Sequence, residues 1–350
     1  MSFSEKIFNN LLATRKLPYP STISIEPVSN LCQLKCPLCP TGVRALGHEP
    51  VIMQLDTFKL LLDKMPFVKV IELYKSGEPF LNPDLFAITK YANDRKIKVT
   101  ISTHFSFAKP DDFFENIVTS GLRRLVVSLD GTSQESYSQY RIGGDYELVM
   151  SNIKKLLQAK DRLHSKRPEI VWQFLVTRFN EHEIPIARKL ANDLRVTLDI
   201  RPFGLSDDVP DIEIEETIQE RKAYWLPTDE SYISDCYKGE YTYPLNKGLC
   251  TQLFTRLVVT AEGKILPCCE VWDKSSVFGD LMTESFEDIW YNQKYLDARS
   301  RFLKNDFRPQ VQSVCFRCNN FYATPALKDK LKLVIAVFRK NIRYWVNSFF

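Results

Sequence analysis

The sequence has little glycine, no long apolar run and almost no net charge, and each of these shortages excludes a class of protein. Only 12 of its 350 residues are glycine, which excludes a collagen-like or low-complexity chain. No apolar run reaches the roughly 18 residues that a membrane span requires. Lys and Arg number 47 against 43 Asp and Glu, and a net charge of +4 predicts no nucleic-acid partner.

The first twelve residues, MSFSEKIFNNLL, also lack the continuous apolar core of a secretory signal. We therefore expect a cytoplasmic protein whose cysteines stay reduced. A hydrophobic content of 44% with 26% charged residues is typical of globular chains. The nine cysteines are the unusual feature, and in a reduced compartment they favour metal ligation over disulfides.

Short β-rich runs alternate with amphipathic stretches between residues 22 and 204. Strands are predicted at Ile23–Pro27, Val68–Tyr74, Lys98–Thr103, Arg124–Asp130, Ile170–Thr177 and Val196–Phe203. Helices are predicted at Leu55–Met65, Asp84–Arg95, Asp111–Ser120, Tyr146–His164 and Glu183–Leu194. Alternation of this kind predicts parallel βα units. Since six units are two fewer than a closed barrel needs, we predict the α/β class with a partial (βα)6 TIM-like barrel.

The rest of the chain breaks this rhythm. Residues 205–248 are acidic and then turn-rich, which predicts a linker or a lid over the barrel mouth. Two β runs joined by Ala261–Lys264 predict a hairpin, and a helical piece follows at Ser285–Ser300. The expected organisation is an N-terminal extension (1–21), the barrel (22–204), the linker or lid (205–248), a small hairpin and helix domain (249–325) and a basic tail (326–350).

Cys32, Cys36 and Cys39 follow the first predicted strand, with three and then two residues between them. A loop this tight can wrap three thiolates around one face of an iron–sulfur cube and leave one iron open. A zinc knuckle is the alternative, but structural zinc normally takes four ligands in two close pairs, and no fourth Cys or His follows nearby. The triplet therefore favours a 4Fe-4S cluster with one open coordination site.

This C-x3-C-x2-C loop resembles the signature of the radical S-adenosylmethionine (radical SAM) enzymes, whose core is a partial (βα)6 barrel. The resemblance implies that SAM binds the open iron and is cleaved by one electron to methionine and a 5′-deoxyadenosyl radical, which removes a substrate hydrogen. It also implies a low-potential electron donor, flavodoxin-like or ferredoxin-like. One departure is Leu38, which stands where relatives commonly carry an aromatic residue near the adenine.

The segment Tyr74–Pro79 resembles the family's GGEP motif, with Ser76 in place of the first glycine. The resemblance implies that the backbone around Gly77 and the carboxylate of Glu78 receive the amino group of SAM. His104 ends the third predicted strand, where many relatives have Thr-Asn-Gly. It either faces the substrate or is a structural histidine with its hydrogen bonds satisfied.

The segments 128–131 and 140–144 resemble the family's SxDG and YR-x-GG stretch. This resemblance implies that Ser128 and Arg141 hold the carboxylate and ribose of SAM, since an arginine fork pairs a carboxylate bidentately. No catalytic residue beyond the cluster ligands is implied.

The later cysteines resemble the SPASM/Twitch extensions of a subset of radical SAM enzymes. The resemblance implies one auxiliary 4Fe-4S cluster with four ligands: Cys250, Cys268, Cys315 and Cys318. The later cysteines of a full SPASM domain are lacking, so the shorter Twitch form is expected. A closed zinc site on the same four residues, and Cys269 in place of Cys268, are the alternatives. Cys236 either sits free in the linker or approaches the substrate.

Residues 327–350 repeat apolar side chains at a spacing of three to four among six Lys and Arg residues, which predicts a basic amphipathic helix. Three roles remain open for it: docking on the protein's own barrel, binding a membrane surface, or binding a protein partner. The membrane role would make the protein peripheral on the inner face of the membrane.

Together these features predict a radical SAM enzyme with one auxiliary cluster that acts by hydrogen abstraction. A small or carbohydrate-like substrate that is oxidised or modified is favoured, since no peptide-recognition domain is recognisable before the barrel. A peptide-modifying maturase is the first alternative. A non-catalytic zinc-binding interaction protein, anchored to a membrane by its tail, is the alternative from another class.

Overall fold

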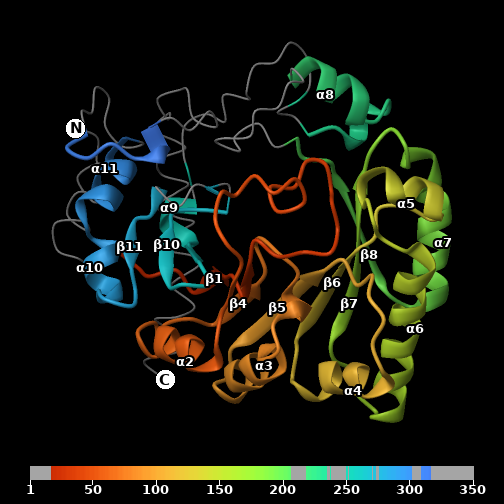
Figure 1. The fold of residues 1–350 in the computed structure, drawn as a ribbon, viewed down its shortest axis with the longest axis horizontal. Helices are drawn as coiled ribbons and strands as arrows, with labels where there is room; N and C mark the ends of the chain where they lie inside the picture. Colours follow the sequence, from red (N-terminus) through yellow and green to blue (C-terminus); the bar gives the residue numbers. More distant parts are fainter. Residues whose placement is uncertain are drawn as a thin grey trace.

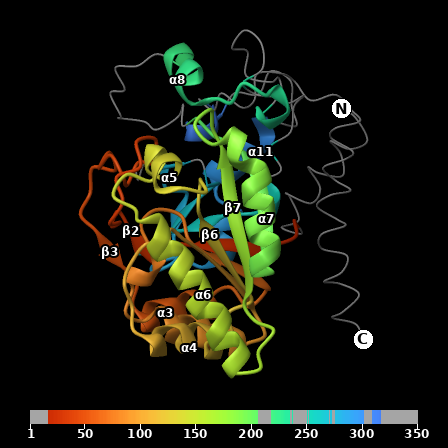
Figure 2. The ribbon, with the colours of Figure 1, turned by 90° about the vertical axis from the view of Figure 1, so that its right-hand side faces the viewer.

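The computed structural model describes residues 17–205, 218–234, 237, 250, 252–269, 271–272, 276–301 and 309–316. Its main feature is a nine-stranded sheet of order β11-β10-β9-β1-β4-β5-β6-β7-β8. The central strands β1 and β4 to β8 run parallel. Figure 1 shows helices α2, α3, α4, α6 and α7 along the outer side of this curved sheet, and Figure 2 shows α6 and α7 outside β7. The predicted α/β class and partial barrel are confirmed.

All six predicted strands are present, with ends within two residues of the prediction: β1 (Thr22–Ile25), β4 (Val70–Leu73), β5 (Lys98–Thr103), β6 (Arg124–Ser128), β7 (Glu169–Val176) and β8 (Thr197–Pro202). The five predicted helices are α2 (Leu55–Asp63), α3 (Leu85–Asp94), α4 (Asp111–Thr119), α6 (Tyr146–Arg162) and α7 (Ile184–Leu194). Sequence reasoning missed α5 (Gln134–Tyr140), whose seven mostly polar residues carry no apolar period.

The strands of the barrel present different residues to their two sides. Ile23, Ile71 and Leu125 are fully buried and form one apolar cluster with the inward faces of the outer helices. The intervening positions are polar: Ser24 pairs in register with Glu72, which pairs with Thr100. Because side chains alternate along a strand, these polar residues line the inner, concave side of the barrel. The inner side is therefore built to hold something polar rather than to be filled by apolar core.

The predicted hairpin is formed by β9 (Val258–Val259) and β10 (Lys264–Leu266), which pair antiparallel. Gly263 takes a φ of +86° in its turn, a conformation that glycine adopts without strain. The sequence did not reveal that β9 also pairs in parallel with β1, so that the hairpin extends the barrel sheet. The rest of this region is α9 (Gln252–Thr255), β11 (Gly279–Asp280), α10 (Phe286–Trp290) and α11 (Gln293–Arg301).

Two smaller elements lie at the mouth of the barrel. β2 (Val28–Ser29) and β3 (Val51–Ile52) pair antiparallel at the base of the loop that carries the first three cysteines. Helix α8 (Ile218–Trp225) comes from the predicted linker or lid and lies over the carboxyl ends of the strands (Figure 1).

Several predictions fall on residues outside the described ranges. They are the residues before 17, most of the linker, the ligand Cys318, the cysteine Cys236, and the whole basic tail from 326 to 350. Within the ranges that are described, no helix combines the length and the apolarity needed to cross a membrane.

Candidate functional site

The loop between β2 and β3 carries the three N-terminal cysteines in a tight bend. The Cys39 N–H donates to the Cys36 carbonyl over 3.1 Å, and the Leu34 N–H donates to Cys32 Sγ over 3.4 Å. A Cβ at Gly42 would lie 2.5 Å from the Cys36 carbonyl oxygen, so only glycine lets the chain return this closely. The bend therefore keeps Cys32, Cys36 and Cys39 within one compact loop.

The thiols affect one another's ionisation. Burial raises the pKa of Cys32 to about 12, with further increases from the charges of Glu78, Cys36 and Cys39. Burial also raises the pKa of Cys36, while the guanidinium of Arg141 lowers it. Three thiolates crowded in this way need a positively charged group between them, and iron supplies that charge. The donor set therefore fits the predicted cluster.

In the described ranges no three His, Cys, Asp or Glu side chains have the arrangement of a site for a single metal ion.

Arg141 lies where three motif segments meet. Its Nε donates a 2.6 Å hydrogen bond to Asp130 Oδ2, and its Nη1 lies 3.9 Å from Cys36 Sγ. Its charge also acts on Glu78, where it lowers the pKa of the carboxyl, and on His104, where it lowers the pKa of the ring. Segments that are far apart in the sequence are thus gathered around one guanidinium.

The segment that resembles the GGEP motif is held against the cysteine loop. Ser76 donates from its N–H to Glu26 Oε1 over 3.2 Å, and its hydroxyl bonds the same oxygen. Gly77 has a φ of +75°, and a Cβ there would lie 2.8 Å from the Leu31 carbonyl oxygen. The Gly77 N–H donates to Thr41 Oγ1 over 3.3 Å. Gly77 is therefore required by both its backbone conformation and its packing.

The Glu78 carboxylate is 2% exposed, and both of its oxygens are engaged. Oε1 accepts from Thr103 Oγ1 (2.7 Å) and the Phe80 N–H (3.1 Å), and Oε2 accepts from the His104 N–H (3.0 Å). Burial raises the pKa of Glu78 to about 7 although these bonds and Arg141 oppose it. A direct contact between Glu78 and the amino group of SAM stays a prediction.

His104 is 5% exposed, and its hydrogen bonds assign one tautomer. Nδ1 accepts from the Ser106 N–H over 3.0 Å, so the ring proton is on Nε2. Nε2 then donates to Gln33 Oε1 over 3.0 Å and lies 3.3 Å from Glu78 Oε2. Burial lowers the pKa of His104 to about 3, which keeps the ring neutral. Of its two predicted roles, these contacts describe the structural one.

Ser128 ends β6 on the inner side of the barrel, in register with Gln173. Two further arginines lie on the inner side of the barrel and were not predicted from the sequence. They are Arg201 on β8 and Arg256 just before β9. The sequence contained a signal for Arg201, because Asp199 and Arg201 alternate with the partly buried Leu198 and Ile200 along the strand. Arg256 carried none, because its partner Glu72 is 184 residues away.

The C-terminal cysteines differ in their surroundings. Cys250 and Cys315 are each 8% exposed and belong to the main apolar cluster, and Cys268 packs on the cluster of Val258, Leu266 and Val271. Tyr295 is affected by two of these cysteines. Burial is the main cause of the raised pKa of Tyr295, and the charges of Cys315 and Cys268 raise this pKa further. Cys268 and Cys315 therefore both lie within electrostatic range of Tyr295.

Cys269 is exposed, and its charge acts on Tyr74 at the mouth of the barrel. Cys268 is less exposed than Cys269, and the choice of Cys268 as the auxiliary ligand stays a prediction. Cys318, the fourth predicted ligand, lies outside the described residues.

The described part of the predicted lid packs on the cysteine loop. Trp225 of α8 stacks on Phe203 at 5.5 Å between centroids and meets Tyr140 edge-on at 5.6 Å. Leu38, the departure from the family pattern, is packed against the same cluster. Aromatic side chains from the lid and from α5 therefore belong to the same cluster as Leu38.

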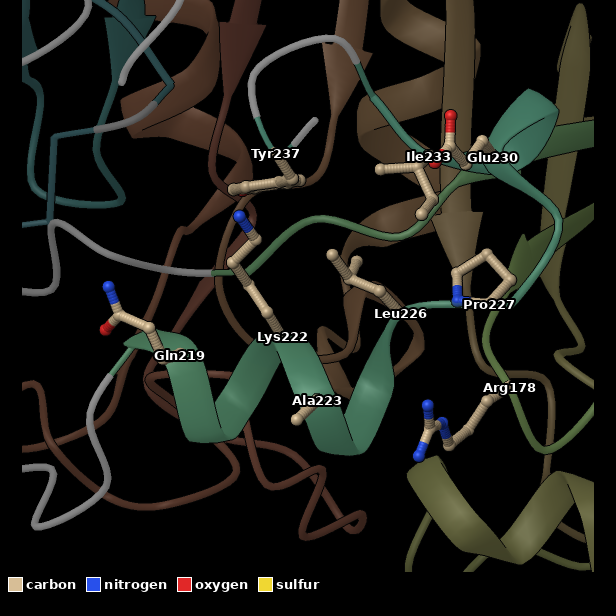
Figure 3. Close-up of a pocket in the computed structure, with 9 residues that line it drawn as sticks. All are labelled: Arg178, Gln219, Lys222, Ala223, Leu226, Pro227, Glu230, Ile233 and Tyr237. Atoms are coloured by element: carbon tan, nitrogen blue, oxygen red, sulfur yellow. The ribbon is translucent and has the colours of Figure 1, made fainter. Parts of the chain in front are cut away.

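A cavity of about 410 Å³ lies between α8 and the turn that follows it. Its lining combines apolar side chains with Arg178, Lys222 and Glu230. In Figure 3 the Lys222 side chain extends from α8 toward Tyr237. This cavity is separate from the network around Arg141.

Two family models match the chain. The model described as "Radical SAM superfamily" matches residues 27–167, and the SPASM model, described as "Iron-sulfur cluster-binding domain", matches residues 250–319. The first therefore contains the three N-terminal cysteines and the Glu78 and Arg141 segments, and the second contains Cys250 to Cys318.

Among curated proteins, the chain is 28% identical over 130 residues to the AdoMet-dependent heme synthase of Methanosarcina barkeri, covering 37% of each chain. It is 25% identical over 259 residues to the probable GTP 3′,8-cyclase of Methanococcus maripaludis, covering 70% of this chain and 83% of that one. The match thus spans only about a third of the heme synthase.

Among solved structures, Streptococcus suis SuiB bound to the precursor peptide SuiA superposes with a TM-score of 0.61 at 15% identity. The superposition covers 90% of this chain and 73% of SuiB. At this identity the likeness establishes a shared fold.

Proposed function

Because the chain belongs to the radical SAM superfamily and carries a SPASM domain, we propose that it abstracts a hydrogen atom from a small polar substrate. The superfamily domain binds a 4Fe-4S cluster and SAM, and the SPASM domain binds auxiliary iron–sulfur clusters. When bound and reduced, the first cluster supplies the electron that cleaves SAM to a 5′-deoxyadenosyl radical. The match to these two family models favours an enzyme over a zinc-binding interaction protein.

The residues at the barrel mouth hold and orient these groups. Cys32, Cys36 and Cys39 ligate the first cluster. Arg141, kept charged and fixed in place by Asp130, pairs with the carboxylate of SAM, and Ser128 adds a hydrogen bond on the same side. The backbone at Gly77 accepts the amino group, in a segment that the buried Glu78 holds rigid.

In the auxiliary region, Cys250, Cys268, Cys315 and Cys318 ligate one 4Fe-4S cluster. Four thiolate ligands saturate such a cluster, so its role is to relay an electron or to stabilise the fold. The parallel pairing of β9 with β1 attaches this region directly to the barrel sheet.

The observation that carries the proposal is the convergence on Arg141. One guanidinium lies beside Cys36 and acts on Glu78 and His104, which belong to three separate segments of the chain. The polar inner side of the barrel supports a polar, carbohydrate-like substrate. Peptide modification is the alternative, and the SuiB likeness supports only the fold.

The test is anaerobic reconstitution of the full chain with iron and sulfide, followed by reduction with dithionite in the presence of SAM. We expect about eight irons per chain, for two clusters, and formation of 5′-deoxyadenosine. Absence of iron–sulfur absorbance together with intact SAM would refute the proposal.

We also propose a flavodoxin-like or ferredoxin-like donor for the first cluster, since SAM cleavage needs a strong reductant. Replacing dithionite with a reduced flavodoxin should sustain 5′-deoxyadenosine formation. The membrane role of residues 327–350 is tested by flotation: the full chain should float with anionic liposomes, and a chain ending at Pro325 should not.

A further inference from the structure

Two arginine–carboxylate pairs occupy the inner side of the barrel, away from the residues assigned to SAM. Arg256 donates from Nη1 to both oxygens of Glu72 at 3.1 and 3.0 Å, and Ser24 Oγ donates to the same carboxylate at 2.9 Å. Arg201 donates from Nε to Asp199 Oδ2 at 2.7 Å. We refer to these five residues as the inner-face cluster.

Both pairs lie on the inner face of the curved sheet. Glu72 is on β4 and Arg201 is on β8, and three strands separate β4 from β8 in the sheet. Both arginines nevertheless act on one phenol, that of Tyr74 at the end of β4. Burial and then the Glu72 charge raise the pKa of Tyr74 to about 12, whereas the charges of Arg256 and Arg201 oppose this rise. Both guanidinium groups therefore lie within electrostatic range of Tyr74, and the register places both pairs on the inner face of the sheet.

The carboxylates hold the two arginines in place but leave some guanidinium N–H groups without a carboxylate acceptor. A guanidinium has five N–H groups, and each carboxylate here engages only one nitrogen of its arginine. The side chains of Arg201 and Arg256 are 59% and 41% exposed, so both remain accessible to a ligand. Because the carboxylates of Glu72 and Asp199 are already engaged, the inner-face cluster has more N–H donors than acceptors. A ligand that matches it must be rich in acceptors.

We propose that Arg201 and Arg256 bind a carboxylate or phosphate group of the substrate on the inner side of the barrel. In this arrangement the Tyr74 hydroxyl donates a third hydrogen bond to the same group. An oxyanion suits two pinned guanidinium forks because each fork pairs two acceptor oxygens at once. This inference rests on the proposed function, and it narrows the substrate class to polar molecules that carry such a group.

The test is equilibrium dialysis of reconstituted full-length protein with radiolabelled pyrophosphate in one arm and radiolabelled succinate in the other. Saturating SAM is present throughout, so that the Arg141 region is filled. We expect at least one probe to bind, and Arg201→Gln and the double variant Glu72→Gln/Arg256→Gln each to weaken its binding at least about tenfold. The double variant avoids leaving the Glu72 carboxylate, 17% exposed, without its cation.

Arg162→Gln is the matched control, because Arg162 is 50% exposed and pairs with Glu115 on the outer helices. It should bind both probes as the wild type does. Preference for pyrophosphate indicates a phosphate-bearing substrate, and preference for succinate indicates a carboxylate. Failure of both probes to bind wild type, or unchanged binding by both inner-face variants, overturns the inference. Formation of 5′-deoxyadenosine is measured on the same samples, so that a failure of the proposed function is recognised separately.

Discussion

Arg141 Nε lies 2.6 Å from Asp130 Oδ2, and the same guanidinium meets Cys36 Sγ at 3.9 Å. Asp130 is itself fixed, since its Oδ1 accepts from the Leu175 N–H at 2.8 Å and its side chain is fully buried. A carboxylate held in this way orients the arginine toward the cysteine loop. The pair therefore joins the predicted SAM site to β7.

Asp130→Asn should weaken SAM binding about tenfold, because the amide loses the charge that orients Arg141. Equilibrium dialysis with labelled SAM measures this. The iron content should be unchanged, since no cluster ligand is altered. Asp56→Asn, which changes an 89% exposed aspartate paired with Lys59, is the control and should bind SAM normally. Wild-type affinity in Asp130→Asn would show that Arg141 does not depend on this pair.

Cys36→Ala should abolish 5′-deoxyadenosine formation, because two thiolates do not hold the first cluster. The auxiliary cysteines are untouched, so the iron content should fall from about eight to about four per chain rather than to zero. Iron analysis and product quantification on the same sample check both statements. Retained SAM cleavage in this variant contradicts the ligand assignment.

Cys268→Ala and Cys269→Ala form a matched pair on adjacent residues. Cys268 packs on the apolar cluster of Val258, Leu266 and Val271, whereas Cys269 is exposed and its charge acts on Tyr74. Cys268→Ala should lose about four irons while it still cleaves SAM, and Cys269→Ala should retain all its iron. Electron paramagnetic resonance of the reduced proteins distinguishes the two clusters. The reverse pattern of iron loss would transfer the ligand role to Cys269.

The sequence predicted the barrel because apolar side chains recur on its strands and helices with regular spacing. Ile23, Ile71 and Leu125 carry that signal locally, and they are fully buried. Helix α5 had no such signal: Ser133 caps it by accepting from the Ser136 N–H at 3.2 Å, and buried Glu183 accepts from the Ser136 hydroxyl at 2.7 Å. Glu183 lies 47 residues further along the chain, so this support is tertiary.

The same distinction applies to the site. The cysteine triplet, Glu78 and Arg141 were found because local motifs contain them. The pairing of Arg256 with Glu72 and the tautomer of His104 depend on residues that only the folded sheet brings together. Local spacing holds no information about such contacts, because any of several arginines could have reached Glu72.

His104 should make the protein less stable in acid. Its pKa of about 3 in the folded state is below the ordinary value of 6.5, so the unfolded state binds more protons between these values. Stability therefore rises with pH across this window and is lost as the pH falls below about 6.5. At pH 5 the loss relative to pH 7 is on the order of 2 kcal/mol.

His104→Gln removes this pH-dependent contribution to stability. The Tm of the variant should therefore fall less between pH 7 and pH 5 than the Tm of the wild type. Glu78, whose raised pKa acts in the opposite direction, is present in both proteins. His182→Gln, at an exposed histidine, is the control and should follow the wild type. Equal losses of Tm in His104→Gln and the wild type would contradict the neutral, buried assignment.

Glu181 anchors the described part of the lid to the loop after β7. Its carboxylate accepts from the Thr228 N–H at 2.9 Å, the Thr228 hydroxyl at 2.8 Å and the Asp229 N–H at 3.0 Å. Burial alone would raise the pKa of Glu181, but these bonds outweigh it and lower the pKa. The anchor is therefore present at neutral pH and is lost as the pH falls through that lowered pKa.

Glu181→Gln should loosen this anchor, because the amide presents donors to backbone N–H groups that need an acceptor. Hydrogen exchange of the backbone amides of residues 226–234 should become about tenfold faster, while exchange in β4 to β7 stays the same. Glu230→Gln changes an exposed carboxylate in the same segment and should leave exchange unaltered. If Glu181→Gln exchanges like the wild type, the packing of Trp225 on Phe203 and Tyr140 holds the lid without the carboxylate.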